Sequence, residues 1–173
     1  MKLKKFHFYK VKSTNDTAIR LIRNGNSYGI VSSEIQTNGK GQRGNKWISK
    51  KGNIFVSIFF KINNKLSIKK LTNKNLSVLK SIISHQIGKK IKVKLPNDIL
   101  IDKKKVCGIL QEIIQNDNYK YIIVGIGINI INSPNILNYP TTCLNNYSNK
   151  KINKIKMINK IKLFFEKNIK FEN

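Results

Sequence analysis

The sequence of 173 residues has few cysteines and no long hydrophobic run. Its two cysteines, Cys107 and Cys143, are too few and too isolated for a disulfide framework or a zinc knuckle. No apolar run reaches the roughly 18 to 20 residues of a membrane-spanning helix, and the Lys-rich start is not followed by the apolar stretch of a secretory signal. These absences predict a cytoplasmic protein that does not enter a membrane.

Acidic residues and arginines are also scarce. Asp and Glu number 8 against 34 Lys and Arg, which gives a formal net charge of +26. Such a surplus suggests a nucleic-acid-binding module, but specific readout favours arginine, and here only Arg20, Arg23 and Arg43 are arginines. The scattered lysines accompany many Ile and Asn residues, which share A/T-rich codons. Compositional drift and a functional surface for polyanions therefore both remain open, and attraction to acidic partners should weaken with salt.

The length suits one domain, and 40% hydrophobic residues supply a core. Hydrophobic patterning predicts helices that start at Ser13 and cover 71–87 and 150–167. It predicts strands at 6–11, 29–35, 53–60, 90–95, 98–102, 106–114 and 119–131. Mainly adjacent strands with helices interspersed favour an α+β sheet layered against helices, and no strand–helix alternation supports a Rossmann fold. We expect a single domain over 1–173.

Two of the predicted helices carry specific signals. Ser13 is a candidate N-cap with Asp16 as its capping-box partner, and Gly25 is a candidate stop. Gly88 closes the second helix. The tail helix is expected to bury one face, which consists of Ile152, Ile155, Ile158, Ile161 and Phe165.

A glycine-rich segment at 39–44 carries the first candidate site. Its glycines let backbone amides approach an anion, Lys40 and Arg43 add positive charge, and Trp47 offers a flat face for a base. The spacing is neither that of a P-loop nor that of a dinucleotide fingerprint. A phosphate-binding loop is the prediction, and a flexible basic surface loop is its alternative.

A predicted hairpin carries the second candidate site. Pro96 ends one strand, so that Asp98 and Lys105 stand at two ends of the next hairpin and are expected to approach each other. A carboxylate and a lysine at one mouth suit nucleotide transfer, whereas a hairpin with a solvated lysine cluster is the alternative. Further on, Gly125 and Gly127 in an apolar strand mark the close approach of a ligand or another backbone, or a bulge.

Four motifs occur together and in order: S-T-N-D at 13–16, Q-T-N-G-K-G-Q-R-G-N-K-W at 36–47, K-L-P-N-D at 94–98 with K-K-V-C-G-I-L-Q-E at 104–112, and G-I-G-I-N at 125–129. In this combination the chain resembles the biotin–protein ligases (biotin–[acetyl-CoA-carboxylase] ligases) from Ser13 to about Phe165. The resemblance implies a biotin–lipoate ligase catalytic domain, similar to class II aminoacyl-tRNA synthetases, with a mixed sheet flanked by helices.

The resemblance also implies residue roles. Biotin binding falls on Ser13, Thr14, Asn15, Gln36, Lys40, Gly41, Gln42, Lys105 and Gly108. ATP binding falls on Lys40, Gln42, Arg43, Trp47, Asn97, Lys105 and Asn129. The implied catalytic residues are Lys105, Asp98 and Arg43, and Asn97 is the implied contact of Mg²⁺. Glu112 also resembles a family position, although a surface carboxylate at a strand end is the interpretation that we favour.

The implied reaction joins biotin to ATP as biotinyl-5′-AMP and then transfers biotin to one lysine of a carrier protein such as that of acetyl-CoA carboxylase. The cofactors would be ATP and Mg²⁺. Two departures are Gln42 in place of a common arginine and Leu95 in place of a tryptophan. We expect neither an N-terminal DNA-binding domain nor a C-terminal SH3-like domain, hence no gene repression and no specific nucleic-acid partner. Strand edges would permit a homodimer.

The nearest enzyme alternative is a lipoate ligase or an octanoyltransferase, which share this fold class. An octanoyltransferase would use a cysteine to carry the acyl group, and Cys107 is the candidate. Because Cys107 falls in an apolar strand, a small core residue is the prediction instead.

Overall fold

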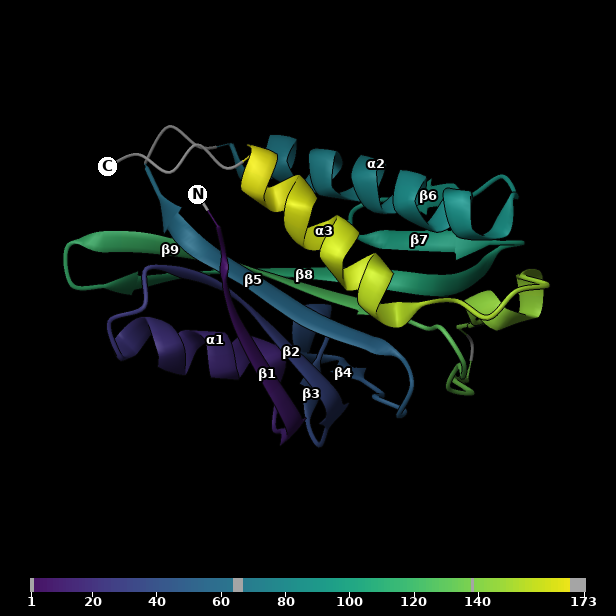
Figure 1. Cartoon of the computed structure of the whole chain (residues 1–173), viewed down its shortest axis with the longest axis horizontal. Coiled ribbons are helices and arrows are strands. Elements are labelled where there is room, and N and C mark those ends of the chain that lie inside the picture. The colour runs from purple at the N-terminus through teal and green to yellow at the C-terminus, as the bar shows by residue number, and fades with distance from the viewer. Residues whose placement is uncertain (1, 64–66, 138, 169–173) are drawn as a thin grey trace.

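The structure is a computed structural model that describes residues 2–63, 67–137 and 139–168 (Figure 1). A seven-stranded sheet has the order β1-β2-β5-β9-β8-β7-β6. Its strands are β1 (Lys4–Val11), β2 (Tyr28–Gln36), β5 (Ile54–Ile62), β6 (Lys92–Lys94), β7 (Asp98–Ile101), β8 (Lys104–Asn116) and β9 (Tyr119–Ile128). The helices are α1 (Thr14–Arg23), α2 (Ile68–Ile87) and α3 (Lys154–Asn168), with short 3₁₀ turns η1 (Gln42–Gly44) and η2 (Leu144–Tyr147).

The sheet is mixed, as the resemblance implies. β1 pairs with β2 in parallel, and every other neighbouring pair is antiparallel. Parallel strands need a crossover, and α1 supplies it, so the chain starts with one β–α–β step that the sequence patterning did not predict. A separate two-stranded ribbon, β3 (Gly39–Lys40) and β4 (Lys46–Trp47), forms where a loop was predicted.

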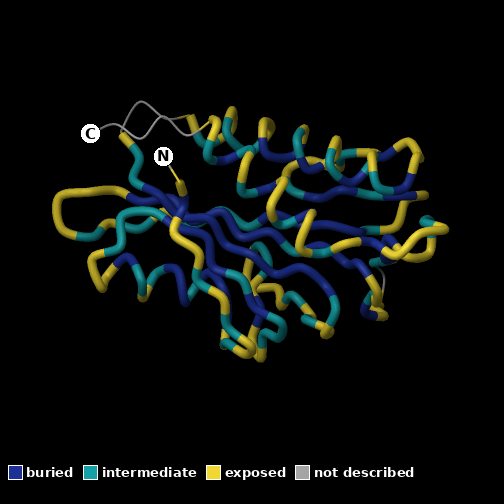
Figure 2. Tube along the Cα trace, viewed as in Figure 1, coloured by how far each residue is buried: buried dark blue, intermediate teal, exposed yellow. Residues whose placement is uncertain are grey.

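Helices cover both faces of the sheet, which places the buried strands in the middle (Figures 1 and 2). α2 and α3 lie on one face, where they join the larger hydrophobic core, and α1 lies on the other. Successive side chains of β5 divide between the two cores: Ile58 faces α2 and α3, and Phe59 faces α1. Because successive side chains of a strand point to opposite faces, only every second residue of the central strands can reach the α1 side.

The predicted caps at Ser13 and Gly88 are confirmed, and the predicted stop at Gly25 is one residue from the observed end of its helix. The Ser13 hydroxyl accepts from the Asp16 amide at 3.4 Å as the N-cap of α1. Asn24 caps α1 at its C-terminal end, one residue before the predicted Gly25, which has φ +83°. Gly88 closes α2 with φ +63°. The Asp16 carboxylate pairs with Lys40 rather than completing a capping box.

The predicted apolar face of the tail helix is wrong in part. Met157, Ile161 and Phe165 are the buried residues of α3, whereas Ile155 is 69% exposed. The residues 155, 158 and 161 follow steps of three, and each such step turns 300° around a helix of 3.6 residues per turn. A series of these steps drifts around the helix, while the steps of four from Met157 to Phe165 stay on one face. Ile152 is buried but precedes the helix.

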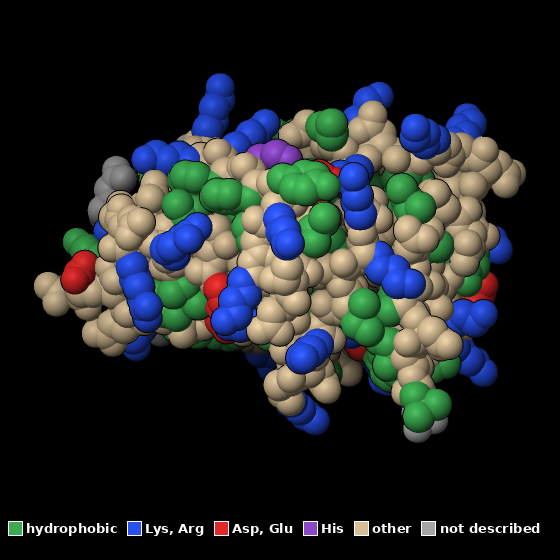
Figure 3. Space-filling model, turned by 90° about the horizontal axis from the view of Figure 1, so that it is seen from below, with side chains coloured by type: hydrophobic (Ala, Val, Ile, Leu, Met, Phe, Trp, Pro, Cys, Tyr) green, Lys and Arg blue, Asp and Glu red, His purple; other side chains and the backbone are tan. Residues whose placement is uncertain are grey.

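Lysine and arginine side chains are spread over the face in Figure 3 rather than gathered into one stripe, and few acidic side chains lie between them. A nucleic-acid-binding surface usually clusters its cations along one face or one helix. This distribution lends that alternative no support on the face shown. No helix in the described part of the chain is long and apolar enough to cross a membrane.

Candidate active site

Glycines hollow out the sheet on the face that carries α1. Gly108 of β8 is paired with Gly127 of β9, and Gly125 lies two residues before Gly127 in the same strand. A Cβ added at Gly127 would stand 2.5 Å from the Cζ2 atom of Trp47, and one at Gly108 would stand 2.8 Å from the same ring. At Gly125 the close neighbour is Asn15. The close approach predicted at these glycines is therefore present, but the groups that approach them are the side chains of Trp47 and Asn15.

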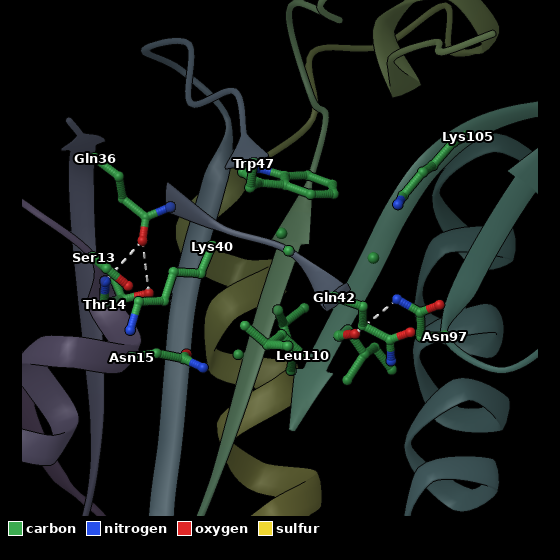
Figure 4. Close-up of a pocket in the computed structure, with 16 residues that line it drawn as sticks. Ser13, Thr14, Asn15, Gln36, Lys40, Gln42, Trp47, Asn97, Lys105 and Leu110 are labelled. Atoms are coloured by element: carbon green, nitrogen blue, oxygen red, sulfur yellow. Dashed lines mark hydrogen bonds between the residues drawn. The ribbon is translucent and has the colours of Figure 1, made fainter. Parts of the chain in front are cut away.

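A cavity of about 450 Å³, partly open to solvent, lies over these glycines (Figure 4). We call it the first cavity. Many residues singled out in the sequence line it: Ser13, Thr14, Asn15, Gln36, Lys40, Gly41, Gln42, Trp47, Asn97, Lys105 and Gly108. In Figure 4 the residues from α1 and β2 lie on one side, Asn97 and Lys105 lie on the other, and Trp47 and Leu110 lie between.

A network of hydrogen bonds forms the polar end of the first cavity. The Gln36 Oε1 atom accepts from the Thr14 amide at 2.7 Å and from the Thr14 hydroxyl at 3.0 Å. The Ser57 hydroxyl lies 2.8 Å from Thr14 Oγ1 and 2.5 Å from Asn15 Oδ1. Thr14, Asn15 and Ser57 are buried, so their polar groups are held in fixed positions.

The interpretation of Glu112 as a surface carboxylate at a strand end is wrong. Glu112 lies inside β8, and its Oε2 atom accepts from Asn15 Nδ2 at 2.5 Å. The same carboxylate is 4.0 Å from Lys40 Nζ. Ser57 was not predicted at all. The sequence of β5 does contain a signal for Ser57, because this polar residue interrupts the apolar run 54–60.

The ribbon of β3 and β4 covers the first cavity from above and brings in Lys40 and Trp47. Lys40 forms an ion pair with Asp16 of α1, and this hydrogen bond raises the pKa of Lys40 above its usual value against the effect of burial. The cation therefore ties the ribbon to the start of α1. Arg43 has φ +55° and is exposed on the turn of the ribbon, outside the lining of the cavity, so the structure does not bring it to the other candidate residues.

Asp98 and Lys105 meet across the β7–β8 hairpin, as the sequence predicts. Lys105 Nζ lies 2.8 Å from Asp98 Oδ1 and 5.3 Å from the centroid of the Trp47 ring. The other oxygen of Asp98, Oδ2, accepts from the hydroxyl of Tyr139. Burial, together with this bond, raises the pKa of Tyr139 above its ordinary value, so that the phenol stays protonated and donates. Tyr139 was missed because its segment shows no periodic pattern.

A second cavity of about 350 Å³ adjoins the first, and Trp47 and Lys105 line both. Its remaining walls are Lys46, Ile48, Asn129 and four residues of the segment 134–141, namely Pro134, Ile136, Tyr139 and Thr141. Backbone hydrogen bonds at 2.8 and 2.9 Å join Lys105 to Pro140 and Thr142, which holds these two residues beside the lysine. The structure thus places Asn129 in the second cavity rather than the first. Its Nδ2 atom donates to the Thr142 carbonyl at 3.1 Å.

The described residues form no cluster of ligands for a resident metal ion, and the implied contact of Asn97 with Mg²⁺ stays a prediction. None of them form a group of three or more His, Cys, Asp or Glu that could hold one. Asn97 Nδ2 donates to the Ile109 carbonyl at 3.1 Å, and both oxygens of the adjacent Asp98 are engaged by Lys105 and Tyr139. Mg²⁺ usually takes one or two carboxylates together with substrate phosphates. Magnesium enters the account only as the counter-ion that ATP carries.

Cys107 is fully buried in the larger core, as predicted for a structural thiol. Burial raises the pKa of this thiol well above its ordinary value. A nucleophilic cysteine needs the opposite shift and access to its substrate. The environment of Cys107 therefore does not suit an acyl carrier.

Residues 7–129 match the model of the Biotin/lipoate A/B protein ligase family, which is most of the chain. The chain belongs to this family. It is 32% identical over 169 residues to the bifunctional ligase/repressor BirA of Bacillus subtilis (strain 168), a match that covers 91% of this chain. The chain spans 51% of that relative's length.

Solved structures of biotin protein ligases share the fold. The enzyme from Aquifex aeolicus in complex with biotin and ATP matches with a TM-score of 0.79 at 26% identity, over 95% of this chain and 69% of that one. The Leishmania major enzyme in complex with biotinyl-5-AMP matches with a TM-score of 0.75 at 25% identity, over 91% and 71%. The mixed seven-stranded sheet with three helices thus matches the catalytic domain of the biotin protein ligases.

Proposed function

We propose that this member of the family is a biotin–protein ligase, which forms biotinyl-5′-AMP from biotin and ATP and then transfers biotin to a lysine of a carrier protein. The observation that carries the proposal is the pair of adjoining cavities with one lysine, Lys105, lining both. A reaction that joins two small molecules needs a site for each and a charged group at the junction. Relatives solved with biotin and ATP, or with biotinyl-5-AMP, support this assignment.

The polar end of the first cavity favours biotin over lipoate. The ureido ring of biotin offers two N–H donors and one carbonyl acceptor, whereas the dithiolane ring of lipoate offers neither. Thr14 and Asn15 line this end, and hydrogen bonds with the buried Ser57 fix their polar groups. A site built to form hydrogen bonds rejects an analogue that cannot return them.

Adenylation brings together two anions, because the carboxylate of biotin attacks the α-phosphate of ATP and releases pyrophosphate. Lys105 at the junction offsets this repulsion, and Asp98 fixes the position of its ammonium group at 2.8 Å. The second cavity takes the nucleotide, with Trp47 and Asn129 in its walls. The indole N–H of Trp47 is buried and has no hydrogen-bond partner among the described residues, which leaves a donor for a ligand oxygen.

The adenylate is an activated acyl group that water would hydrolyse. The ribbon β3–β4 lies over the first cavity and is tied to α1 by the pair Lys40–Asp16, so it is placed to shelter the adenylate. Lys40 adds a cation beside the polar end. Arg43 would join this set only through a rearrangement of the turn. The acceptor is the carrier protein of acetyl-CoA carboxylase, whose acidic surface the net charge of +26 would attract.

The test is substrate-dependent exchange of pyrophosphate into ATP by the purified protein, with biotin, lipoate or octanoate as the acid. The proposal predicts exchange with biotin and the product biotinyl-5′-AMP by mass spectrometry. Exchange with lipoate or octanoate but not with biotin would assign the chain to the other branch of the family. The variant Thr14→Val keeps the size of the side chain and should weaken biotin selectively, because the hydroxyl between Gln36 and Ser57 is lost.

A further inference from the structure

The carboxylate of Asp98 is enclosed, and Tyr139 is one of the two side chains that enclose it. Asp98 is 7% exposed and lines neither the first nor the second cavity among the described residues. Its two oxygens are engaged by Lys105 and by the Tyr139 hydroxyl, both of which belong to residues that do line the second cavity. A substrate amine that approaches Asp98 from the side of the second cavity therefore meets the phenol before the carboxylate.

The Tyr139 hydroxyl can donate one hydrogen bond and accept another at the same time. Its hydroxyl hydrogen points to Asp98 Oδ2, so the lone pairs of its oxygen are left for another donor. A hydrogen bond to a carboxylate also polarises the phenol and makes its oxygen a stronger acceptor. The phenol and the buried carboxylate together form a chain along which one proton can move.

We propose that Tyr139 relays a proton from the acceptor lysine to Asp98 during the transfer step. The proposal rests on the proposed function and adds a residue to it. As the amine nitrogen forms its bond to the acyl carbon of the adenylate, the bond from that carbon to the phosphate oxygen breaks and AMP leaves. The nitrogen must lose one proton, which passes to the Tyr139 oxygen while the phenol proton passes to Asp98 Oδ2.

The charges around Tyr139 suit this role. Lys94 Nζ lies 4.8 Å and Lys105 Nζ 5.4 Å from the centroid of the Tyr139 ring. Nearby positive charges disfavour a further ammonium ion, so an incoming lysine is favoured in its neutral, nucleophilic form. The relay serves only the second step, because adenylation releases no proton from a nitrogen.

The experiment separates the two steps in the variant Tyr139→Phe, which keeps the ring in the wall of the second cavity. Biotin-dependent pyrophosphate exchange measures adenylation, and transfer from preformed biotinyl-5′-AMP to a biotin carrier domain is measured in a single turnover. We expect transfer to slow by about 100-fold and exchange to slow far less, so that the ratio of the two rates changes. Tyr119→Phe, at an exposed tyrosine of β9, is the matched control and should change neither.

Two further measurements distinguish a relay from a structural contact. If Tyr139 acts through Asp98, Tyr139→Phe should have little further effect on transfer in an Asp98→Asn background. With hydroxylamine as acceptor, whose protonated nitrogen loses its proton readily to water, the defect of Tyr139→Phe should largely disappear. Transfer at the wild-type rate, or an equal loss in both steps, would overturn the relay. Absence of biotin-dependent exchange in the wild type would instead overturn the proposed function.

Discussion

The indole ring of Trp47 lies directly against the backbone of Gly127, in contact so close that no other side chain fits at position 127. Gly127 belongs to a central strand, and Trp47 belongs to the small ribbon that covers the first cavity. The rigid sheet thus determines where the ribbon rests. The contact also sets the height of the ring above the cavity floor, and hence the space left for a ligand.

Replacing Gly127 with alanine should displace the ribbon without unfolding the sheet. The added methyl group would overlap the ring of Trp47, and the end of the ribbon is easier to move than β9. We expect weaker binding of biotin and ATP, with little change in melting temperature. Trp47 is the single tryptophan of the chain, so its fluorescence reports the displacement directly. Unchanged emission and unchanged affinity would show that this contact does not hold the ribbon in place.

Cysteine chemistry should not contribute to activity. Cys107 is fully buried in the core, and burial raises the pKa of its thiol. Cys107→Ala should therefore retain most of the activity, with at most a modest loss of stability from the smaller side chain. Exchange and transfer assays on this variant check the prediction. A catalytically dead but folded variant would point to an acyl-thiol intermediate and to an octanoyltransferase.

The C-terminal helix should show pH-dependent stability through Glu166. Its Oε1 atom accepts from the Leu3 amide at 2.7 Å and pairs with Lys162. Burial acts to raise the pKa of Glu166, but these hydrogen bonds and the charge of Lys162 outweigh it and lower the pKa below its usual 4.5. The ionised group therefore stabilises the fold above pH 4.5, and the contribution is lost as the pH falls through the lowered pKa.

The corresponding measurement is the melting temperature of Glu166→Gln against pH. At pH 7 it should lie about 2–4 °C below the wild type. The difference should shrink as the pH is lowered from 4.5 through the folded pKa. Asp102→Asn removes a carboxylate from an exposed turn and is the control for the change in net charge. A difference that persists unchanged at the lowest pH would mean that the charge of Glu166 is not what stabilises the helix.

The sequence predicted the parts of the site that local chemistry determines. The N-cap of α1 at Ser13 and the left-handed Gly88 each depend on one residue and its neighbours in the chain. The approach of Asp98 to Lys105 follows from a tight hairpin, which joins residues close in sequence. The mixed sheet came from the family resemblance, and the single parallel pair β1–β2 was not visible in the strand patterns.

The missed features depend on contacts between segments far apart in the chain. Glu112 lies against Asn15 because α1 packs over β8, and no local pattern in β8 reveals this. Tyr139 reaches Asp98 from a segment without regular structure. Arg43 matches the family motif, yet it is exposed and lines neither cavity, although its neighbour Gln42 lines the first one. In each case the residue type was visible in the sequence, but its partner was not.

The most direct test of the account is the mass of a biotin carrier domain after incubation with the protein, biotin and MgATP. The account predicts a gain of one biotinyl group with the wild type and with Lys104→Ala, an exposed neighbour that carries the same charge. It predicts a rate lower by about 100-fold or more with Lys105→Ala, because the cation at the junction of the two cavities is lost. No gain with the wild type, or an equal rate with Lys105→Ala, would contradict it.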